Sequence, residues 1–136
     1  MTDSDFLAIE RLFSDFAWYA DRGNGVLLAE LFLPNGILCV GDLELTGRSQ
    51  IAEDCHRRSL SLGRQTRHVW SNLRIDRSDA DAATSTAVQV TFEQNVSSGE
   101  PTQIRVSDLF DTLKKDLHGE WRFVRRFIKR EIALST

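Results

Sequence analysis

The sequence predicts an α+β fold in which helices from the first half of the chain pack on one face of an antiparallel sheet. In that first half, apolar residues recur at three- and four-residue spacing, which is typical of amphipathic helices. From Thr66 onward they alternate with polar residues at a spacing of two, which is typical of strands. Helices followed by consecutive strands favour an α+β domain. A strongly curved sheet covered in this way leaves a concave pocket.

The first helix is expected to carry an apolar stripe made of Phe6, Ile9, Leu12, Phe13, Phe16, Ala17 and Ala20. Thr2 and Asp5 form a capping pair at its start, and Gly23 provides its end. A second helix is predicted over Gly25–Phe32, closed by a turn at Pro34-Asn35-Gly36.

Two short strands are predicted next, over Ile37–Val40 and Leu43–Leu45, on either side of Gly41-Asp42. A third helix should follow Gly47 and run from Ser49 to Leu62, ending at Gly63.

Four long strands are expected in the second half, separated by turns at 76–81, 97–101 and 116–120. In the first of them, one face should hold Val69, Ser71, Leu73 and Ile75, and the other His68, Trp70, Asn72 and Arg74. The later strands show alternating sets of Val88, Val90 and Phe92, then Ile104, Val106, Asp108 and Phe110, then Trp121, Phe123, Arg125 and Phe127.

Length and composition indicate one globular domain over residues 1–136. Hydrophobic residues make up 41% of the chain and charged residues 27%, which excludes disordered, collagen-like and low-complexity classes. No apolar run approaches the ~20 residues of a membrane-spanning helix. The acidic start, Met1 to Asp5, lacks the features of a secretory signal. We therefore predict a cytoplasmic protein that does not bind membranes.

The charges argue against nucleic acid as a partner. The chain has 17 basic and 20 acidic residues and a net charge of −3, whereas nucleic-acid binding requires a basic excess or stripe. Three scattered histidines and two distant cysteines lack the spacing of a zinc site, so no metal is predicted. Cys39 and Cys55 are expected to be small buried hydrophobes, with a single disulfide between them as the alternative.

His68 is the first candidate for chemistry, because histidine can accept and return a proton near neutral pH. A carboxylate on its other ring nitrogen would set the tautomer and stabilise the imidazolium. Asp21 is the candidate partner, since an acid at a helix C-terminus faces the negative end of the helix dipole, an unfavourable position that can mark a function. The residues alone leave open a purely structural histidine and a solvated aspartate.

The last strand carries a basic stretch made of Arg122, Arg125, Arg126, Lys129 and Arg130. Alternation spreads these charges over both faces, so most should be solvated or paired. One of them could point into the pocket and bind an anion or stabilise an oxyanion. Aromatic side chains could line the pocket or simply fill the core, namely Phe16, Tyr19, Trp70, Phe92 and Phe110.

Several segments, in this order and spacing, give the chain a resemblance to a known family. They are Tyr19-Ala20-Asp21, the run Leu31 to Gly36, Gly47 to Ile51, Thr66 to Ile75, and Gly119 to Arg126. Together they resemble the SnoaL-like group of the nuclear transport factor 2-like superfamily over nearly the whole chain. The resemblance implies a cystatin-like, cone-shaped barrel: a curved antiparallel sheet wrapped around three helices and enclosing one pocket.

Within this group the chain is similar to the branch of scytalone dehydratase and hexachlorocyclohexane dehydrochlorinase. That resemblance implies proton abstraction by His68, oriented by Asp21, without a cofactor, and places the dehydrochlorinase's pocket arginine at Arg126. The chain departs from the branch at Phe16, where the dehydrochlorinase has a lysine, and it lacks the second histidine that scytalone dehydratase has on a later strand. Neither of the two substrates is therefore implied.

The leading hypothesis is a cofactor-independent lyase or isomerase that acts on a small, mostly apolar, cyclic molecule. His68 and Asp21 would be catalytic, and Trp70, Tyr19, Arg126 and Asn72 would contact the substrate. A polyketide-cyclase role with similar acid–base chemistry is another possibility. The alternative is a non-catalytic protein, either the small subunit of an aromatic-ring-hydroxylating dioxygenase or a ligand-binding homo-oligomer. An apolar outer sheet face would need cover, which predicts a homodimer or homotrimer.

Overall fold

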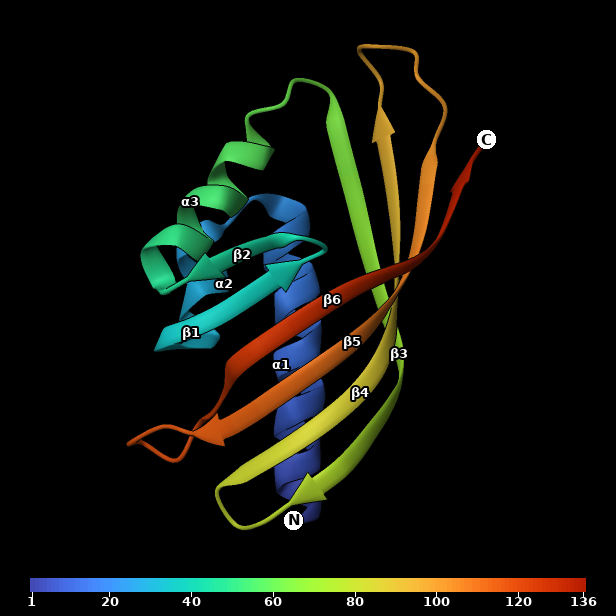
Figure 1. The fold of residues 1–136 in the computed structure, drawn as a ribbon. Coiled ribbons are helices and arrows are strands. Elements are labelled where there is room, and N and C mark those ends of the chain that lie inside the picture. Colours follow the sequence, from blue (N-terminus) through green and yellow to red (C-terminus); the bar gives the residue numbers. More distant parts are fainter.

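A computed structural model describes residues 1–136 and contains three helices and one six-stranded sheet. The elements are α1 (Asp3–Arg22), α2 (Gly25–Glu30), β1 (Phe32–Val40), β2 (Leu43–Thr46), α3 (Arg48–Ser59), β3 (Arg64–Ser78), β4 (Ala82–Asn95), β5 (Gln103–Lys115) and β6 (Trp121–Ser135). The strands lie in the order β2-β1-β6-β5-β4-β3. Figure 1 shows the sheet curving around α1, with α2 and α3 covering the end near β1 and β2.

The predicted α+β fold with a curved sheet around helices is confirmed. Two details differ from the prediction. The β1–β6 pair is parallel, while the other four pairs are antiparallel. The sheet also stays open, because β2 and β3 are its edges and do not pair with each other. No helix is both long and apolar enough to cross a membrane.

Helix α1 begins and ends as its sequence predicts. The Thr2 side chain accepts a hydrogen bond from the backbone N–H of Asp5, and the Asp5 carboxylate accepts one from the backbone N–H of Thr2. Gly23 takes the left-handed conformation at the C-terminus, with φ of 67°. A Cβ at Gly23 would lie 2.3 Å from the Cβ of Ser59, so this glycine also permits the close approach of α3.

The next segments differ from their predicted boundaries. Helix α2 ends at Glu30 instead of Phe32, and Phe32 already pairs with Phe123 of β6. The run Pro34-Asn35-Gly36 lies inside β1, where the pairing with β6 is interrupted between Phe32 and Ile37. It is therefore an irregularity within a strand instead of a turn before one. Helix α3 spans Arg48–Ser59 and stops three residues before the predicted end at Leu62.

Two bulges change which residues face the helices. In β3 the register with β4 shifts between Ser71 and Arg74, and Asn72 has a φ of 58°. Before the bulge His68 and Trp70 are partly buried, and after it Leu73 and Ile75 pack against the core. The prediction that Leu73 and Ile75 share a face with Val69 is therefore wrong, because the extra residue moves the side chains that follow it to the opposite face, until the register shifts again between Ile75 and Arg77.

A second bulge lies in β6. Its register with β5 shifts where Leu113 pairs with Phe123 and Thr112 with Arg125, which leaves Val124 unpaired. Trp121 and Phe123 are buried before the shift, and Arg126 and Ile128 are buried after it. The predicted single alternation from Trp121 to Phe127 is thus wrong, and the bulge turns Arg126 inward.

The inner face of the sheet includes buried polar residues, and its outer face includes exposed apolar residues. The buried inner positions of β4 and β5 include polar residues, namely Ser85, Gln89, Thr91, Ser107 and Asp111. The alternating apolar residues of the same strands lie on the other face, where Phe92 and Phe110 are each 42% exposed. These two phenylalanines therefore lie outside the core and outside the space between the sheet and the helices. The core instead forms around four phenylalanines with ring centroids 5.1–6.3 Å apart, namely Phe13, Phe16, Phe32 and Phe123.

Cys39 and Cys55 are both buried and free. They act as small hydrophobes, and the alternative of a disulfide is not realised.

Candidate functional site

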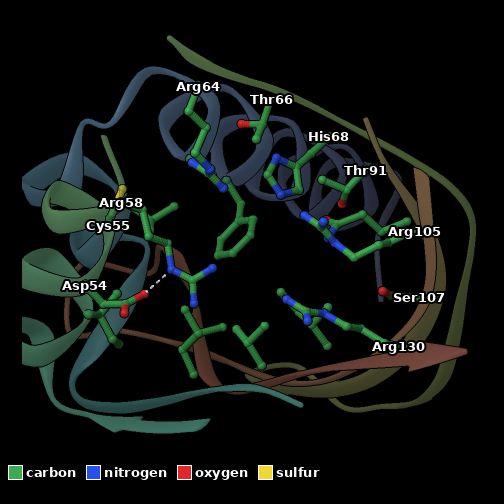
Figure 2. Close-up of a pocket in the computed structure, with 18 residues that line it drawn as sticks. Asp54, Cys55, Arg58, Arg64, Thr66, His68, Thr91, Arg105, Ser107 and Arg130 are labelled. Carbon is green, nitrogen blue, oxygen red and sulfur yellow. Dashed lines mark hydrogen bonds and ion pairs between the residues drawn. The ribbon is translucent and has the colours of Figure 1, made fainter. Parts of the chain in front are cut away.

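A cavity of about 80 Å³ lies between the helices and the concave side of the sheet, at the end covered by α3. Its apolar wall consists of Phe16, Ala20, Leu28, Leu38, Val40, Ile51, Cys55 and Ile128. Its polar wall consists of Asp54, Arg58, Arg64, Thr66, His68, Gln89, Thr91, Arg105, Ser107 and Arg130. Figure 2 shows these polar groups arranged around a common space. A volume of this size favours a compact ligand.

Asp21 and His68 are in direct contact at the edge of this cavity. Oδ1 of Asp21 lies 2.5 Å from Nδ1 of His68, and Oδ2 accepts a hydrogen bond of 3.0 Å from the backbone N–H of His68. Thr66 adds a third hydrogen bond, from its hydroxyl to Oδ1 at 3.0 Å. The side chains of Asp21 and His68 are 4% and 17% exposed. Three donors therefore hold the carboxylate, which offsets its unfavourable position at the C-terminus of α1.

This geometry determines what the imidazole can do. A carboxylate accepts hydrogen bonds, so it favours the tautomer of His68 that carries the proton on Nδ1. Nε2 then holds a lone pair, and it has no hydrogen-bond partner in the protein. Because His68 lines the cavity, Nε2 is the atom available to accept a proton from a bound molecule.

A second, open groove lies on the other side of the contact, between α1 and β3. Trp18, Arg22, Arg67 and Trp70 line it together with Asp21 and His68. This groove is more open to solvent, whereas the inner cavity is more enclosed by the helices and the sheet. The inner cavity is therefore the better candidate for a binding site.

Three of the residues predicted to contact substrate lie elsewhere. Trp70 packs edge-on against Phe13 with ring centroids 5.5 Å apart, and its Nε1–H donates to the hydroxyl of Ser14. Tyr19 packs against the core without lining the cavity. Asn72 is exposed at the β3 bulge, where its left-handed backbone explains the choice of asparagine. Packing and backbone contacts account for these positions in the fold, and their contact with a substrate stays a prediction.

Arg126 lies outside the cavity as well. Its side chain is fully buried, and its Nε lies 3.3 Å from Oδ1 of Asp111. The guanidinium sits among the rings of Phe13, Phe16 and Phe123, at 4.6, 4.4 and 4.6 Å from their centroids. It does not line the cavity. The residue therefore belongs to a buried ion pair below the site, and not to the substrate-binding surface.

Burial of the Arg126–Asp111 pair costs free energy, because both charges lose their hydration. Burial raises the pKa of Asp111 to about 6, although the nearby Arg126 cation acts in the opposite direction. Burial likewise lowers the pKa of Arg126. Neither side chain forms a hydrogen bond of good geometry, so contact between the charges and the aromatic rings must compensate for lost hydration.

The polar wall of the cavity was largely missed by sequence reasoning. Arg58, Arg64 and Arg105 were not singled out, and Arg130 was only one member of a basic stretch. A signal existed for some of them, because Arg64 and Thr66 are in phase with His68 on β3. On β4 the prediction rested on the alternating residues Val88 and Val90. The residues that face inward are instead Gln89 and Thr91.

No group of three or more His, Cys, Asp or Glu side chains is placed so that it could hold a metal ion.

Comparisons with known proteins agree with this architecture. A family model described as "SnoaL-like domain" matches residues 3–127. No curated protein is significantly similar in sequence. A crystal structure provisionally assigned as a scytalone dehydratase, from Novosphingobium aromaticivorans, superposes with a TM-score of 0.86 at 24% identity, covering 100% of this chain and 92% of the other.

Two further structures are similar to the chain. A hexachlorocyclohexane dehydrochlorinase, LinA type 2, has a TM-score of 0.86 at 16% identity and covers 98% of this chain and 89% of its own. A protein provisionally assigned as an aromatic ring hydroxylase, also from Novosphingobium aromaticivorans, has a TM-score of 0.84 at 15% identity, covering 100% and 96%. At these identities the similarity establishes the shared fold.

Proposed function

The chain belongs to the SnoaL-like domain family, and we propose that it is a cofactor-independent lyase or isomerase in which His68 is the general base. The observation that carries this proposal is the contact between Asp21 and Nδ1 of His68, with Nε2 left unpartnered at the cavity. The dehydratase and dehydrochlorinase among the similar structures support the same class of chemistry.

The proposed reaction begins with a proton transfer. Nε2 of His68 takes a proton from a substrate carbon next to an activating group, and the electron pair of the broken C–H bond forms a double bond. Asp21 holds the imidazole in place and stabilises the imidazolium that forms. An isomerase then returns the proton from His68 to a different carbon. A dehydratase instead releases a hydroxyl group, which leaves as water after taking up a proton.

The cavity supports a small substrate with an apolar, cyclic body. Side chains from five elements form its apolar wall, among them Phe16 from α1, Leu28 from α2, Ile51 from α3, Leu38 from β1 and Ile128 from β6. Such walls bind a ring by excluding water from both surfaces.

Hydrogen–deuterium exchange tests the proton transfer whatever the leaving group is. The protein is incubated in D₂O with a panel of small cyclic ketones, and exchange at the carbon next to the carbonyl is followed by mass spectrometry. We expect exchange with the unmodified protein and a loss of about 10²–10⁴-fold in His68→Ala and Asp21→Asn. His118→Ala is the matched control, because His118 is an exposed histidine away from the cavity.

Equal exchange rates in the protein and in His68→Ala would refute the proposal. Absence of exchange for every ketone that binds the cavity would do the same.

We also propose that the chain forms a homodimer or homotrimer through the outer face of the sheet. Side chains that lie partly or largely exposed on this face are Val69, Val88, Val90, Phe92, Ile104, Val106 and Phe110. An apolar sheet face of this kind favours cover by a second copy. Light scattering should give the mass of two or three chains, and a monomer at micromolar concentration would contradict the proposal.

A non-catalytic subunit is the second candidate function. The same apolar outer face and the similarity to a structure provisionally assigned as an aromatic ring hydroxylase favour it. Purification from the native source with a larger iron-containing partner, together with no exchange activity, would support this candidate over the enzyme.

A further inference from the structure

We propose that the natural ligand of the cavity is a small carboxylic acid, bound through its carboxylate by the guanidinium cluster of Arg58, Arg64, Arg105 and Arg130. The proposal deepens the proposed function, since it names the class of substrate that His68 would deprotonate. Figure 2 shows the four guanidinium groups directed toward the same space from α3, β3, β5 and β6.

The first argument is the balance of charge around the cavity. Arg64 and Arg105 share a single carboxylate, Glu93, at 3.3 and 2.9 Å. Arg58 pairs with Asp54 at 2.8 Å, but Asp54 also pairs with Arg57. Three of the four cavity arginines therefore pair with two carboxylates, one of them shared with a further arginine, and Arg130 pairs with none. The cavity is positively charged although the whole chain carries a net charge of −3.

The second argument is that Arg130 has no partner. Its side chain forms no hydrogen bond and no ion pair, while the preceding Lys129 pairs with Glu131 at 3.2 Å. Partial burial lowers the pKa of Arg130, and the neighbouring charges of Arg105 and Arg58 lower it further, while the Glu93 carboxylate acts in the opposite direction. These cations repel one another across the cavity, and a bound anion would relieve the repulsion.

The register of the sheet relates the cluster to the proposed base. His68 pairs with Thr91, and Thr91 pairs with Arg105, so these three side chains lie in one row across the concave face. Ser107 and Arg130 form a neighbouring pair. Two strand spacings separate His68 from Arg105, which is about 10 Å between their backbones. A carboxylate at the arginines would thus place the body of a compact acid beside Nε2 of His68.

The chemistry of the donors favours a carboxylate. Guanidinium groups bind carboxylates with two parallel hydrogen bonds, and the hydroxyls of Thr91 and Ser107 line the same wall as further donors. A volume of about 80 Å³ suits a small acid. Solvation alone does not explain the cluster, because the four arginines converge from four elements on one cavity, although Arg130 is itself largely exposed.

Calorimetric titration with benzoate and with uncharged benzamide tests the proposal. We expect benzoate to bind at least about tenfold more tightly than benzamide, and its affinity to fall with added salt. Arg130→Gln should weaken benzoate binding about tenfold or more while leaving benzamide unaffected. Lys129→Gln is the matched control, since it removes the same charge from the adjacent residue outside the cavity.

Three results would overturn the proposal: no benzoate binding, equal affinity for benzoate and benzamide, or unchanged benzoate affinity in Arg130→Gln. Inorganic phosphate that displaces benzoate with equal affinity would also overturn it, in favour of phosphorylated ligands. Asp21→Asn separates this inference from the proposed function, because it should abolish exchange and retain benzoate binding. If the protein catalyses hydrogen exchange in the ketones but does not bind benzoate, the proposed carboxylate ligand is refuted and the proposed general base is not.

Discussion

Two arginines on one face of β6, four residues apart, have opposite environments. Arg126 is fully buried, lies 3.3 Å from Asp111 and is surrounded by three phenylalanine rings. The side chain of Arg130 lines the cavity and pairs with no carboxylate. Two other arginines, Arg105 and Arg58, are among the charged groups that act on it. The residue type is the same, but only Arg130 is free to bind a ligand.

The difference shows how an arginine in this fold is assigned to structure or to function. A buried guanidinium needs a carboxylate of its own. Removal of either partner leaves the other charge buried and unpaired, which lowers the free energy of unfolding. A guanidinium at the cavity keeps part of its hydration and can exchange it for an anionic ligand. Mutations at the two positions should therefore change different properties, namely folding stability for Arg126 and ligand affinity for Arg130.

The largest effect on stability is expected for Asp111→Asn. At pH 8 this change leaves the cation of Arg126 buried without a partner, and arginine cannot lose its proton to escape the cost. We expect a loss of about 3–5 kcal/mol in the free energy of unfolding, measured by urea denaturation. The double variant Asp111→Asn, Arg126→Met should recover most of that loss. A single variant as stable as the unmodified protein would show that the pair is not coupled.

Arg126→Met should lower the free energy of unfolding by less than Asp111→Asn does, and by an amount that depends on pH. Asp111 can take up a proton when its partner is lost, and its folded pKa, already about 6, should rise further. A raised pKa means that the folded state binds more protons than the unfolded state, so stability falls as pH increases above the unfolded value. Relative to the unmodified protein, the variant should lose up to about 1.4 kcal/mol per pH unit above pH 6.

Urea denaturation between pH 5 and pH 8 measures this slope. The double variant is the control and should lack the extra slope, because it contains no carboxyl group at position 111. A deficit of Arg126→Met that stays constant over the whole range would exclude protonation of Asp111 as the cause.

The smallest effect is expected for Arg130→Met, which should change the free energy of unfolding by no more than about 0.5 kcal/mol. The arginine has no partner to leave behind, and its removal relieves repulsion from Arg105 and Arg58. Lys129→Met provides the comparison, since it breaks an exposed ion pair with Glu131 that contributes about 0–1 kcal/mol. A loss of several kcal/mol in Arg130→Met would place this arginine in the structural class with Arg126.

Local signals predicted the elements of the fold but not their inner faces. The caps at Thr2 and Gly23 were identified because capping depends on neighbours within a few residues. The inner faces of β3 and β6 were not, because each strand contains bulges that shift its phase. Asn72 and Val124 carry no strong sequence signature of a bulge, yet each reverses the alternation beyond it.

The candidate site shows a similar division. Asp21 was named as the candidate partner of His68 from its position at the end of the first helix, and the resemblance to a family supported the pairing, although 47 residues separate the two. The guanidinium cluster was missed because its four members come from four elements. A basic residue on an isolated strand is most simply explained by solvent, and only the assembled sheet reveals that four of them converge.

The sequence by itself determined the α+β class, the order of helices and strands, and the residue types available for chemistry, because hydrophobic periodicity and capping act over a few residues. Tertiary structure alone decided which arginine became buried and which lines the cavity. Two residues added by bulges set the phase of β3 and β6, and cross-strand pairing then placed side chains from distant segments together. Such placement depends on the register between strands, for which a single strand contains no information.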